Sequence, residues 1–317
     1  MLWIAVFLIA GAAMLYFGSE WLVRGAKGLA LRLGVTPFVI GLTVLAFGSS
    51  APEAITSIVS SAYPDLILGN VLGSNIANIG LAIGLAAIAG PMAAKYKTMR
   101  LEMITMILVS VGLCIMGLLG YVGRIEGIIL ILLLFVFLYV VFKKKSNDEE
   151  GQEAYLEEVT PETLKSPILV ALCVIGLVLL YFGARFFIDG ATRLAEMLYL
   201  PDLVIGLIVV AIGTSLPEIC ISVIAARRGE ADMAVANIVG SNIFNILFVL
   251  GIGSVLVDIP VSESALIFHM PVMLLFAVAM FLVVYKTNRI GRGFGMVFIL
   301  MYAVYIGIMA MVPELMI

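Results

Sequence analysis

The sequence predicts an all-α polytopic membrane protein, with ten transmembrane helices arranged as two inverted five-helix repeats. Three observations lead to this prediction: an apolar composition, a one-sided distribution of basic residues, and polar motifs that occur in both halves. Of the 317 residues, 63% are hydrophobic and 12% are charged, and the mean hydropathy is +1.20. Soluble domains carry about 25% charged residues. So much apolar surface requires lipid, and the lipid bilayer is therefore the first predicted partner.

Ten apolar runs are long enough to cross a bilayer, which takes about 20 residues. The first run begins at Met1 without a basic segment or a small-residue cleavage pattern, so we interpret it as a span and not as a removed signal. The predicted spans lie near 2–18, 37–61, 67–90, 101–120, 125–142, 167–187, 202–226, 233–256, 264–284 and 293–313.

Lysine and arginine residues predict how the spans are oriented, because cytoplasmic loops are enriched in both. With both termini outside the cell, 15 of the 18 basic residues fall on the inner side. The inner set is Arg24, Lys27, Arg32, Lys95, Lys97, Arg100, Lys143, Lys144, Lys145, Lys165, Arg227, Arg228, Lys286, Arg289 and Arg292. The outer set is Arg124, Arg185 and Arg193. We expect a multi-pass protein of the cell (plasma) membrane.

The two halves of the chain share polar positions in the same order. GLTVLAFGSSAPE at 41–53 recurs as GLIVVAIGTSLPE at 206–218, and GNVLGSNIANI at 69–79 recurs as ANIVGSNIFNI at 236–246. We therefore expect a first repeat at 1–145, an acidic cytoplasmic linker at 146–166 and a second repeat at 167–317. Five spans per repeat is an odd number, so the second repeat enters the membrane inverted, as in many secondary transporters.

One glutamate in each half, Glu53 and Glu218, lies well within an apolar run. A buried carboxylate in a membrane is costly and is a functional candidate by default. Oxygen-bearing side chains lie three and four residues before each glutamate, a spacing that puts them on the same helix face. Two more lie four residues apart in the next span. These neighbours are Ser49, Ser50, Ser74 and Asn78 in the first half and Thr214, Ser215, Ser241 and Asn245 in the second.

Backbone oxygens add to these side chains. Pro52 and Pro217 lack an N–H, so the carbonyls of Gly48 and Gly213 lose their helical partner. Carboxylate, hydroxyl, amide and carbonyl oxygens suit a hard cation; Ca²⁺ fits best, and Na⁺ can use the same oxygens. A single buried hydroxyl more often bonds its own backbone, so duplication of the whole pattern carries the site prediction.

Four further asparagines repeat as well, but they point in another direction around their helices. We expect them to be helix-interface residues first and ligands second. They are Asn70, Asn75, Asn237 and Asn242. His269 is the single histidine of the chain, and we expect a hydrogen-bonded histidine at a helix end.

The motifs resemble those of the calcium/cation antiporter superfamily, specifically its sodium/calcium exchanger branch. The resemblance rests on GSSAPE at 48–53 and GTSLPE at 213–218, each followed by GSN-x-x-N, at 73–78 and 240–245. It implies exchange of cytoplasmic Ca²⁺ for external Na⁺ by alternating access, with spans 1 and 6 sliding across the other eight. It also implies that the residues named above are cation ligands, joined by the backbone carbonyls of Ala46 and Ala211.

The chain departs from that family pattern at two ligand positions. Some relatives, including potassium-dependent exchangers, have an aspartate where this chain has Asn78 or Asn245, so the site is expected to hold two carboxylates and not to depend on potassium. The first motif also has Ser49 and Ala51 where threonine and leucine are commoner.

The predicted function is a sodium/calcium antiporter with one central cation site, whose substrates are Ca²⁺ and Na⁺ and which has no cofactor. A proton-coupled calcium antiporter of the same fold is the alternative, and a cation channel is a more distant one. We do not expect an enzyme, because His269 lies outside both motifs. Nucleic acid is excluded by the lack of a basic patch, and no obligatory protein partner is evident.

Overall fold

The computed structural model describes residues 2–50, 54, 64–90, 92–146, 164–198, 213, 215–312 and 315. Within these ranges, eight helices are long and apolar enough to cross a membrane. A shorter apolar helix, Phe38–Ser50, and α12 (Leu216–Arg227) supply the described parts of two more, which gives the ten predicted helices. The predicted all-helical membrane fold is confirmed.

The first half starts with α1 (Leu2–Leu33), followed by α2 (Pro37–Ile40) and the π-helical turn η1 (Gly41–Leu45). The third span is one continuous helix, divided into α4 (Pro64–Ala77), η3 (Asn78–Ile83) and α5 (Gly84–Ala89). Helices α6 (Tyr96–Gly117) and α7 (Arg124–Ser146) complete this half.

The second half has the same order of elements. It comprises α9 (Ser166–Met197), α12, and a long helix divided into α13 (Ala231–Phe244), η5 (Asn245–Leu250) and α14 (Gly251–Leu256). The last two spans are η6 (Ala265–His269) with α15 (Met270–Thr287), and α16 (Arg292–Met311).

The predicted ends of three spans were wrong. Helices α1 and α9 continue to Leu33 and Met197, well past the predicted ends at 18 and 187, and α6 begins at Tyr96 and not at 101. Arg24 and Lys27 therefore lie on a helix and not in a loop. Charged residues can extend a helix beyond the hydrocarbon, because lysine and arginine are good helix formers whose side chains reach the interface.

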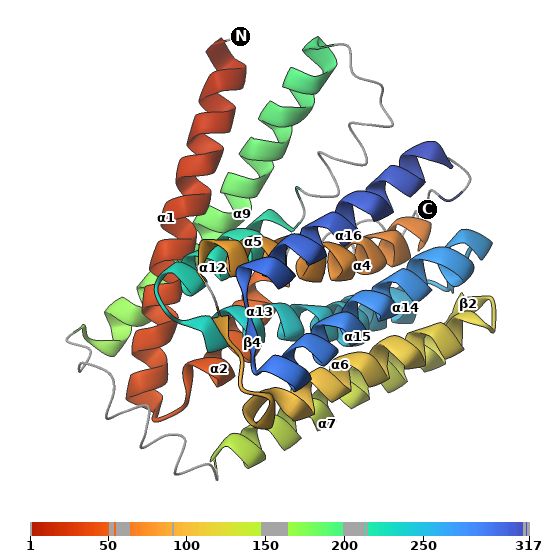
Figure 1. Cartoon of the computed structure of the whole chain (residues 1–317), viewed down its shortest axis with the longest axis horizontal. Coiled ribbons are helices and arrows are strands. Elements are labelled where there is room, and N and C mark those ends of the chain that lie inside the picture. Colours follow the sequence, from red (N-terminus) through yellow and green to blue (C-terminus); the bar gives the residue numbers. More distant parts are fainter. Residues whose placement is uncertain are drawn as a thin grey trace.

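Helices α1 and α9 lie side by side across the rest of the molecule (Figure 1). Their seam is built from glycines seven residues apart: a Cβ on Gly11, Gly18 or Gly25 of α1 would come within 3.0 Å of α9 atoms. The matching glycines of α9 are Gly176, Gly183 and Gly190, the last with its nearest α1 atoms at 3.1 Å. Small residues at such a seam allow two membrane helices to pack backbone to backbone.

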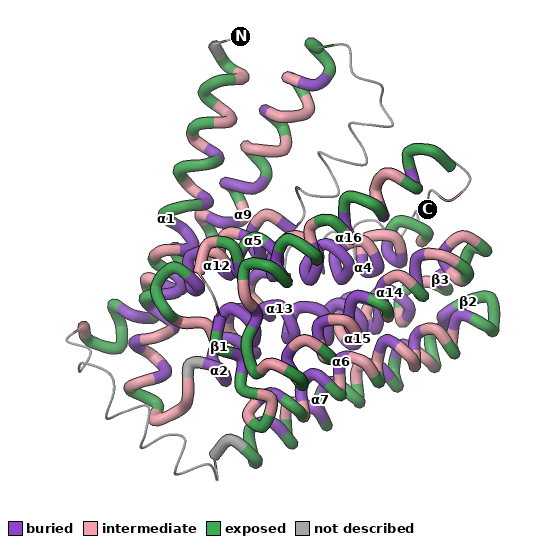
Figure 2. The backbone as a smooth tube through the Cα atoms, in the orientation of Figure 1, coloured by how far each residue is buried: buried purple, intermediate pink, exposed green. Residues whose placement is uncertain are grey.

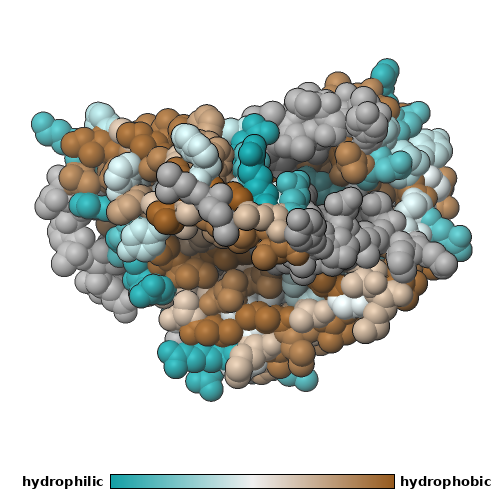
Figure 3. Space-filling model, turned by 90° about the horizontal axis from the view of Figure 1, so that it is seen from above, coloured by the Kyte–Doolittle hydropathy of each residue, from teal (hydrophilic) through white to brown (hydrophobic). Residues whose placement is uncertain are grey.

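Two long helices form the centre of the protein. In an 18-residue apolar stretch of the spans Pro64–Ala89 and Ala231–Leu256, 78% and 83% of the residues are buried, against 28–39% in such stretches of the other six candidate spans. Figure 2 shows these helices mostly in the colour of buried residues, inside a shell of half-exposed ones. In Figure 3, brown apolar side chains cover much of the described part of the visible face, with teal hydrophilic side chains mainly along its edges.

Two short antiparallel strand pairs, which the sequence did not predict, join the halves at their loops. Strand β1 (Met92–Ala93) pairs with β4 (Arg289–Ile290), and β2 (Tyr121–Val122) pairs with β3 (Ile259–Pro260). Each pair links a loop of one repeat to a loop of the other, so the repeats are held together outside their helices as well.

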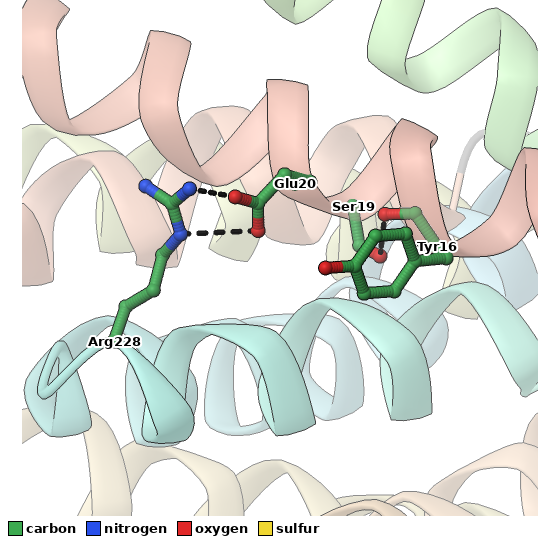
Figure 4. A network of polar contacts seen from close by, with 4 residues as sticks. All are labelled: Tyr16, Ser19, Glu20 and Arg228. Carbon is green, nitrogen blue, oxygen red and sulfur yellow. Dashed lines mark hydrogen bonds and ion pairs between the residues drawn. The ribbon is translucent and has the colours of Figure 1, made fainter.

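Two ion pairs tie α1 to the turn between α12 and α13. Arg228 Nε donates to Glu20 Oε2 at 3.1 Å (Figure 4). Lys27 pairs with Glu230. Nearby on α1, Ser19 donates to the carbonyls of Leu15 and Tyr16, as a buried helical serine usually does.

Candidate cation site

The two signature motifs meet crosswise, with the first motif of one repeat against the second motif of the other. Gly240 of α13 lies so close to the second span that a Cβ there would be 2.7 Å from the Ala46 Cβ. This approach brings the hydroxyls of Ser49 and Ser241 to 3.5 Å of each other. The Ser49 side chain also lies beside the Glu218 carboxylate. Both repeats therefore contribute to one polar centre.

The predicted helix break in the second repeat is present. Helix α12 starts anew at Leu216, with Ser215 as its N-cap and Pro217 in its first turn, where the missing N–H of proline costs nothing. The Ser215 hydroxyl makes no capping hydrogen bond. Glu218 follows in the first turn of the helix and is fully buried. The corresponding break at Pro52 lies outside the described residues.

A π-helical turn begins at each asparagine predicted to be a ligand. Turn η3 starts at Asn78, and turn η5 starts at Asn245. Such turns widen a helix by one residue and are frequent at functional sites. The sequence did not predict them, because π-turns have no strong composition signal.

Four asparagines form a reciprocal network between the central helices. Asn75 Nδ2 donates to the backbone oxygen of Asn242 at 3.2 Å, and Asn242 Nδ2 donates to the backbone oxygen of Asn75 at 3.1 Å. Asn78 Nδ2 donates to Asn242 Oδ1, and Asn245 Nδ2 donates to Asn75 Oδ1, both at 3.0 Å. Asn75 and Asn242 thus lie at the interface between helices, as predicted.

Every described side chain of the predicted ligand set is buried, at 3% exposure or less. Five of their oxygens have no hydrogen-bond partner: Ser50 Oγ, Ser215 Oγ, Glu218 Oε2, Asn78 Oδ1 and Asn245 Oδ1. A buried polar atom left unpaired costs about 1–3 kcal/mol. A bound cation would satisfy oxygens of this kind, because carboxylate, hydroxyl and amide oxygens are all ligands of hard cations.

Three of the predicted ligands, Glu53, Thr214 and Ala211, lie outside the described residues. Ser74 is buried, and its hydroxyl contacts Asn70 Oδ1 at 3.5 Å. Among the residues that the structure describes, no cluster of three His, Cys, Asp or Glu side chains could hold a metal ion. The described part of the site therefore offers mainly hydroxyl and amide oxygens.

Glu102, which the predicted span 101–120 puts at a span end, is a buried carboxylate. It lies in the second turn of α6 and is fully buried. The sequence contains a signal for this position. The second motif recurs after 167 residues, and the same shift aligns Glu102 with His269 and Met106 with Met273, which puts Glu102 inside the repeat. His269 bonds the Tyr305 hydroxyl and the Leu315 carbonyl through its two ring nitrogens, so the prediction of a hydrogen-bonded histidine is confirmed.

Comparison with known proteins places these features in one family. The family model "Sodium/calcium exchanger protein" matches residues 3–143 and again residues 168–311. The putative antiporter CaxA of Alkalimonas amylolytica is 38% identical, over 84% of this chain and 84% of its own. The sodium/calcium exchanger MaX1 of Methanosarcina acetivorans is 30% identical, over 94% and 96%.

The fold is also similar to a solved structure. The sodium-calcium exchanger NCX_Mj, soaked with zero Na⁺ and Ca²⁺, superposes with a TM-score of 0.84 at 32% identity, over 97% of this chain and 99% of that one. Two matches to a single family model are what two copies of one repeat produce. The chain therefore belongs to the sodium/calcium exchanger protein family, as a multi-pass cation/calcium exchanger and not an enzyme.

Proposed function

We propose that the chain is a sodium/calcium antiporter that works by alternating access at one central cation site. The observation that carries the proposal is the set of five buried oxygens without partners, contributed by both repeats. Ca²⁺ takes 6–8 oxygen ligands in flexible geometry, and such a set matches that demand. The likeness to MaX1 and NCX_Mj, both named as sodium/calcium exchangers, supports sodium as the coupling ion.

The proposed ligands are the carboxylates of Glu53 and Glu218 together with nearby hydroxyl, amide and carbonyl oxygens. Glu218 is anchored in the first turn of α12, where the positive end of the helix dipole favours its charge. The remaining proposed ligands are Ser49, Ser50, Ser74, Asn78, Thr214, Ser215, Ser241 and Asn245, with the carbonyls of Ala46 and Ala211.

Exchange follows from the charge of this site. Two carboxylates without a cation leave buried charge uncompensated, which is expensive in a membrane. A load of Ca²⁺, or of Na⁺ ions competing for overlapping oxygens, removes that cost and permits the switch between the two access states. We place the protein in the cell membrane, with its basic loops and the linker in the cytoplasm, as the distribution of lysine and arginine favours.

A proton-coupled calcium antiporter is the second candidate. The likeness to CaxA, a putative antiporter whose name specifies no coupling ion, is compatible with either coupling ion. The same carboxylates would then release protons and not sodium as calcium binds. The two candidates differ in the gradient that drives calcium uptake.

The test is radioactive calcium uptake into proteoliposomes that contain the purified full chain. An outward Na⁺ gradient at equal pH should drive uptake, whereas a pH gradient without Na⁺ should not. Glu218→Gln should abolish uptake, and Glu263→Gln, an exposed carboxylate at the start of the ninth span, should not. Uptake driven only by the pH gradient would favour the second candidate, and sodium-driven uptake that survives in Glu218→Gln would contradict the proposed site.

A further inference from the structure

We propose that Asn75 and Asn242 are positioning residues that hold the amide oxygens of Asn245 and Asn78, respectively, toward the cation, each acting across the repeat boundary. This inference rests on the proposed function, because it concerns the geometry of the same site. The two residues are not among the proposed ligands, since all the polar atoms of their side chains are already used inside the protein.

The argument starts from two backbone carbonyls, which can only accept hydrogen bonds. The carbonyl of Asn242 faces the Asn75 side chain at 3.2 Å, and the carbonyl of Asn75 faces the Asn242 side chain at 3.1 Å. Each of these side chains must therefore present its NH₂ group to the carbonyl. A flipped amide would place oxygen against oxygen.

Sulfur atoms fix the same orientation. The Asn75 Nδ2 lies 3.7 Å from Met273 Sδ, and the Asn242 Nδ2 lies 3.9 Å from Met106 Sδ. A thioether is a weak acceptor, so it suits the second N–H of each amide. With its nitrogen satisfied on one side, each amide turns its oxygen to the other side.

That oxygen then determines how the next asparagine is oriented. Asn75 Oδ1 accepts from Asn245 Nδ2, and Asn242 Oδ1 accepts from Asn78 Nδ2. Because the nitrogens of Asn245 and Asn78 are held in this way, their oxygens must point away from the network. Both are the buried oxygens that lack a partner.

The consequence is an acceptor surface with a fixed direction. Without Asn75, the Asn245 amide could turn its NH₂ group toward the ion, which would repel a cation. Loss of such an orienting partner usually costs about 10–100-fold in metal affinity. The connection is crosswise: a residue of the first repeat positions a ligand of the second, and the reverse.

The test is a pair of double-mutant cycles, read as Ca²⁺ affinity of the purified full chain in detergent with radioactive calcium. Asn75→Leu and Asn245→Ala should each weaken binding about tenfold, and the double variant should be about tenfold weaker, not a hundredfold, because residues that act as a unit are not additive. Asn75→Leu combined with Asn78→Ala should instead multiply to about a hundredfold. Asn242→Leu with Asn78→Ala repeats the crossed cycle independently, should one variant fail to fold.

Asn237→Leu is the matched control, since Asn237 is a buried asparagine on α13 whose amide bonds Ser222 and not a proposed ligand. Its effect on Ca²⁺ affinity should multiply with that of Asn78→Ala and with that of Asn245→Ala. The positioning role would be overturned if the losses of affinity multiplied in both crossed pairs, Asn75 with Asn245 and Asn242 with Asn78. It would also be overturned if Asn75 were coupled as strongly to Asn78 as to Asn245. If the unmodified chain failed to bind Ca²⁺, or if Glu218→Gln left binding intact, the proposed function would fail instead.

Discussion

At the scale of single residues, the unpaired buried oxygens of the candidate site lower the stability of the fold and are available to bind an ion. The Ser215 hydroxyl is fully buried and has no partner, although as an N-cap it could have bonded the helix. N-cap serines normally contribute about 1 kcal/mol to a helix. Here that contribution is absent, and the free hydroxyl is available to an ion.

Ser215→Ala should therefore raise the thermal stability of the protein in a calcium chelator, by about 1 kcal/mol for removing an unpaired buried group. The further stabilisation produced by added Ca²⁺ should shrink, because at a fixed concentration a ligand that binds more weakly stabilises the folded protein less. Thermal unfolding in detergent, with chelator and then with Ca²⁺, measures both effects.

The matched control is Ser110→Ala, since Ser110 is equally buried but donates to the Met106 carbonyl at 2.8 Å. That variant should change stability by the same amount in both conditions. If Ca²⁺ stabilised the Ser215→Ala variant as much as the unmodified chain, the Ser215 hydroxyl would not be a ligand.

Sequence reasoning reached most of the candidate site because the ligand types are unusual inside a membrane and are duplicated. It missed Glu102, because an acidic residue six positions after the start of a helix resembles a span-end residue when the true start is unknown. It also assigned Asn75 and Asn242 to the helix interface without foreseeing their bonds to Asn245 and Asn78. Those bonds depend on side-chain direction across two helices, which spacing along one helix cannot determine.

At the scale of elements, the α1–α9 pair differs from the other helices in how it is attached. Its glycine seam makes it one packed unit, whereas ion pairs tie α1 to the turn before α13. The predicted spans 1 and 6 ended too early because Arg24, Lys27 and Arg193 were treated as loop residues. The extra turns carry Glu20 and Lys27 past the apolar region, where they meet Arg228 and Glu230.

If α1 and α9 slide during exchange, these ion pairs must break and re-form. Glu20→Gln combined with Lys27→Gln should therefore change the maximal exchange rate a few-fold, because exposed ion pairs contribute about 0.2–1 kcal/mol each. Arg228 and Glu20 are 38% and 26% exposed, so the difference from the unmodified chain should also fall as ionic strength rises. Sodium-driven calcium flux at two concentrations of an inert salt measures this.

Arg185→Gln serves as the control for that experiment, since Arg185 lies on α9 and bonds Tyr181 of the same helix. The charge-swapped variant Glu20→Arg with Arg228→Glu, which keeps this ion pair with its charges exchanged, should keep the rate of the unmodified chain. An unchanged rate in the Glu20→Gln, Lys27→Gln variant would show that the ion pairs do not limit the movement.

At the scale of the whole molecule, several contacts between the repeats occur in pairs related by the repeat shift. The asparagine network, its two methionines and the two strand pairs all follow this rule. The rule is broken at Asn70 and Asn237, which occupy equivalent positions. Asn70 is partly exposed, whereas Asn237 is fully buried against Ser222. The two repeats therefore differ in how far this asparagine is covered.

Inverted repeats with different conformations can exchange them, and the exchange moves access from one side of the membrane to the other. In the present conformation, a cysteine at position 70 should react with a membrane-impermeant thiol reagent and one at position 237 should not. Conditions that favour the opposite state should reverse this pattern, with the reagent now acting from the other side. The assay uses Asn70→Cys and Asn237→Cys in a chain whose Cys114, Cys173 and Cys220 are replaced by alanine, and Ser254→Cys, buried on α14 away from both positions, as a control that should stay unreactive. Simultaneous labelling of both positions from one side would indicate a continuous path, as in a channel, and would contradict alternating access.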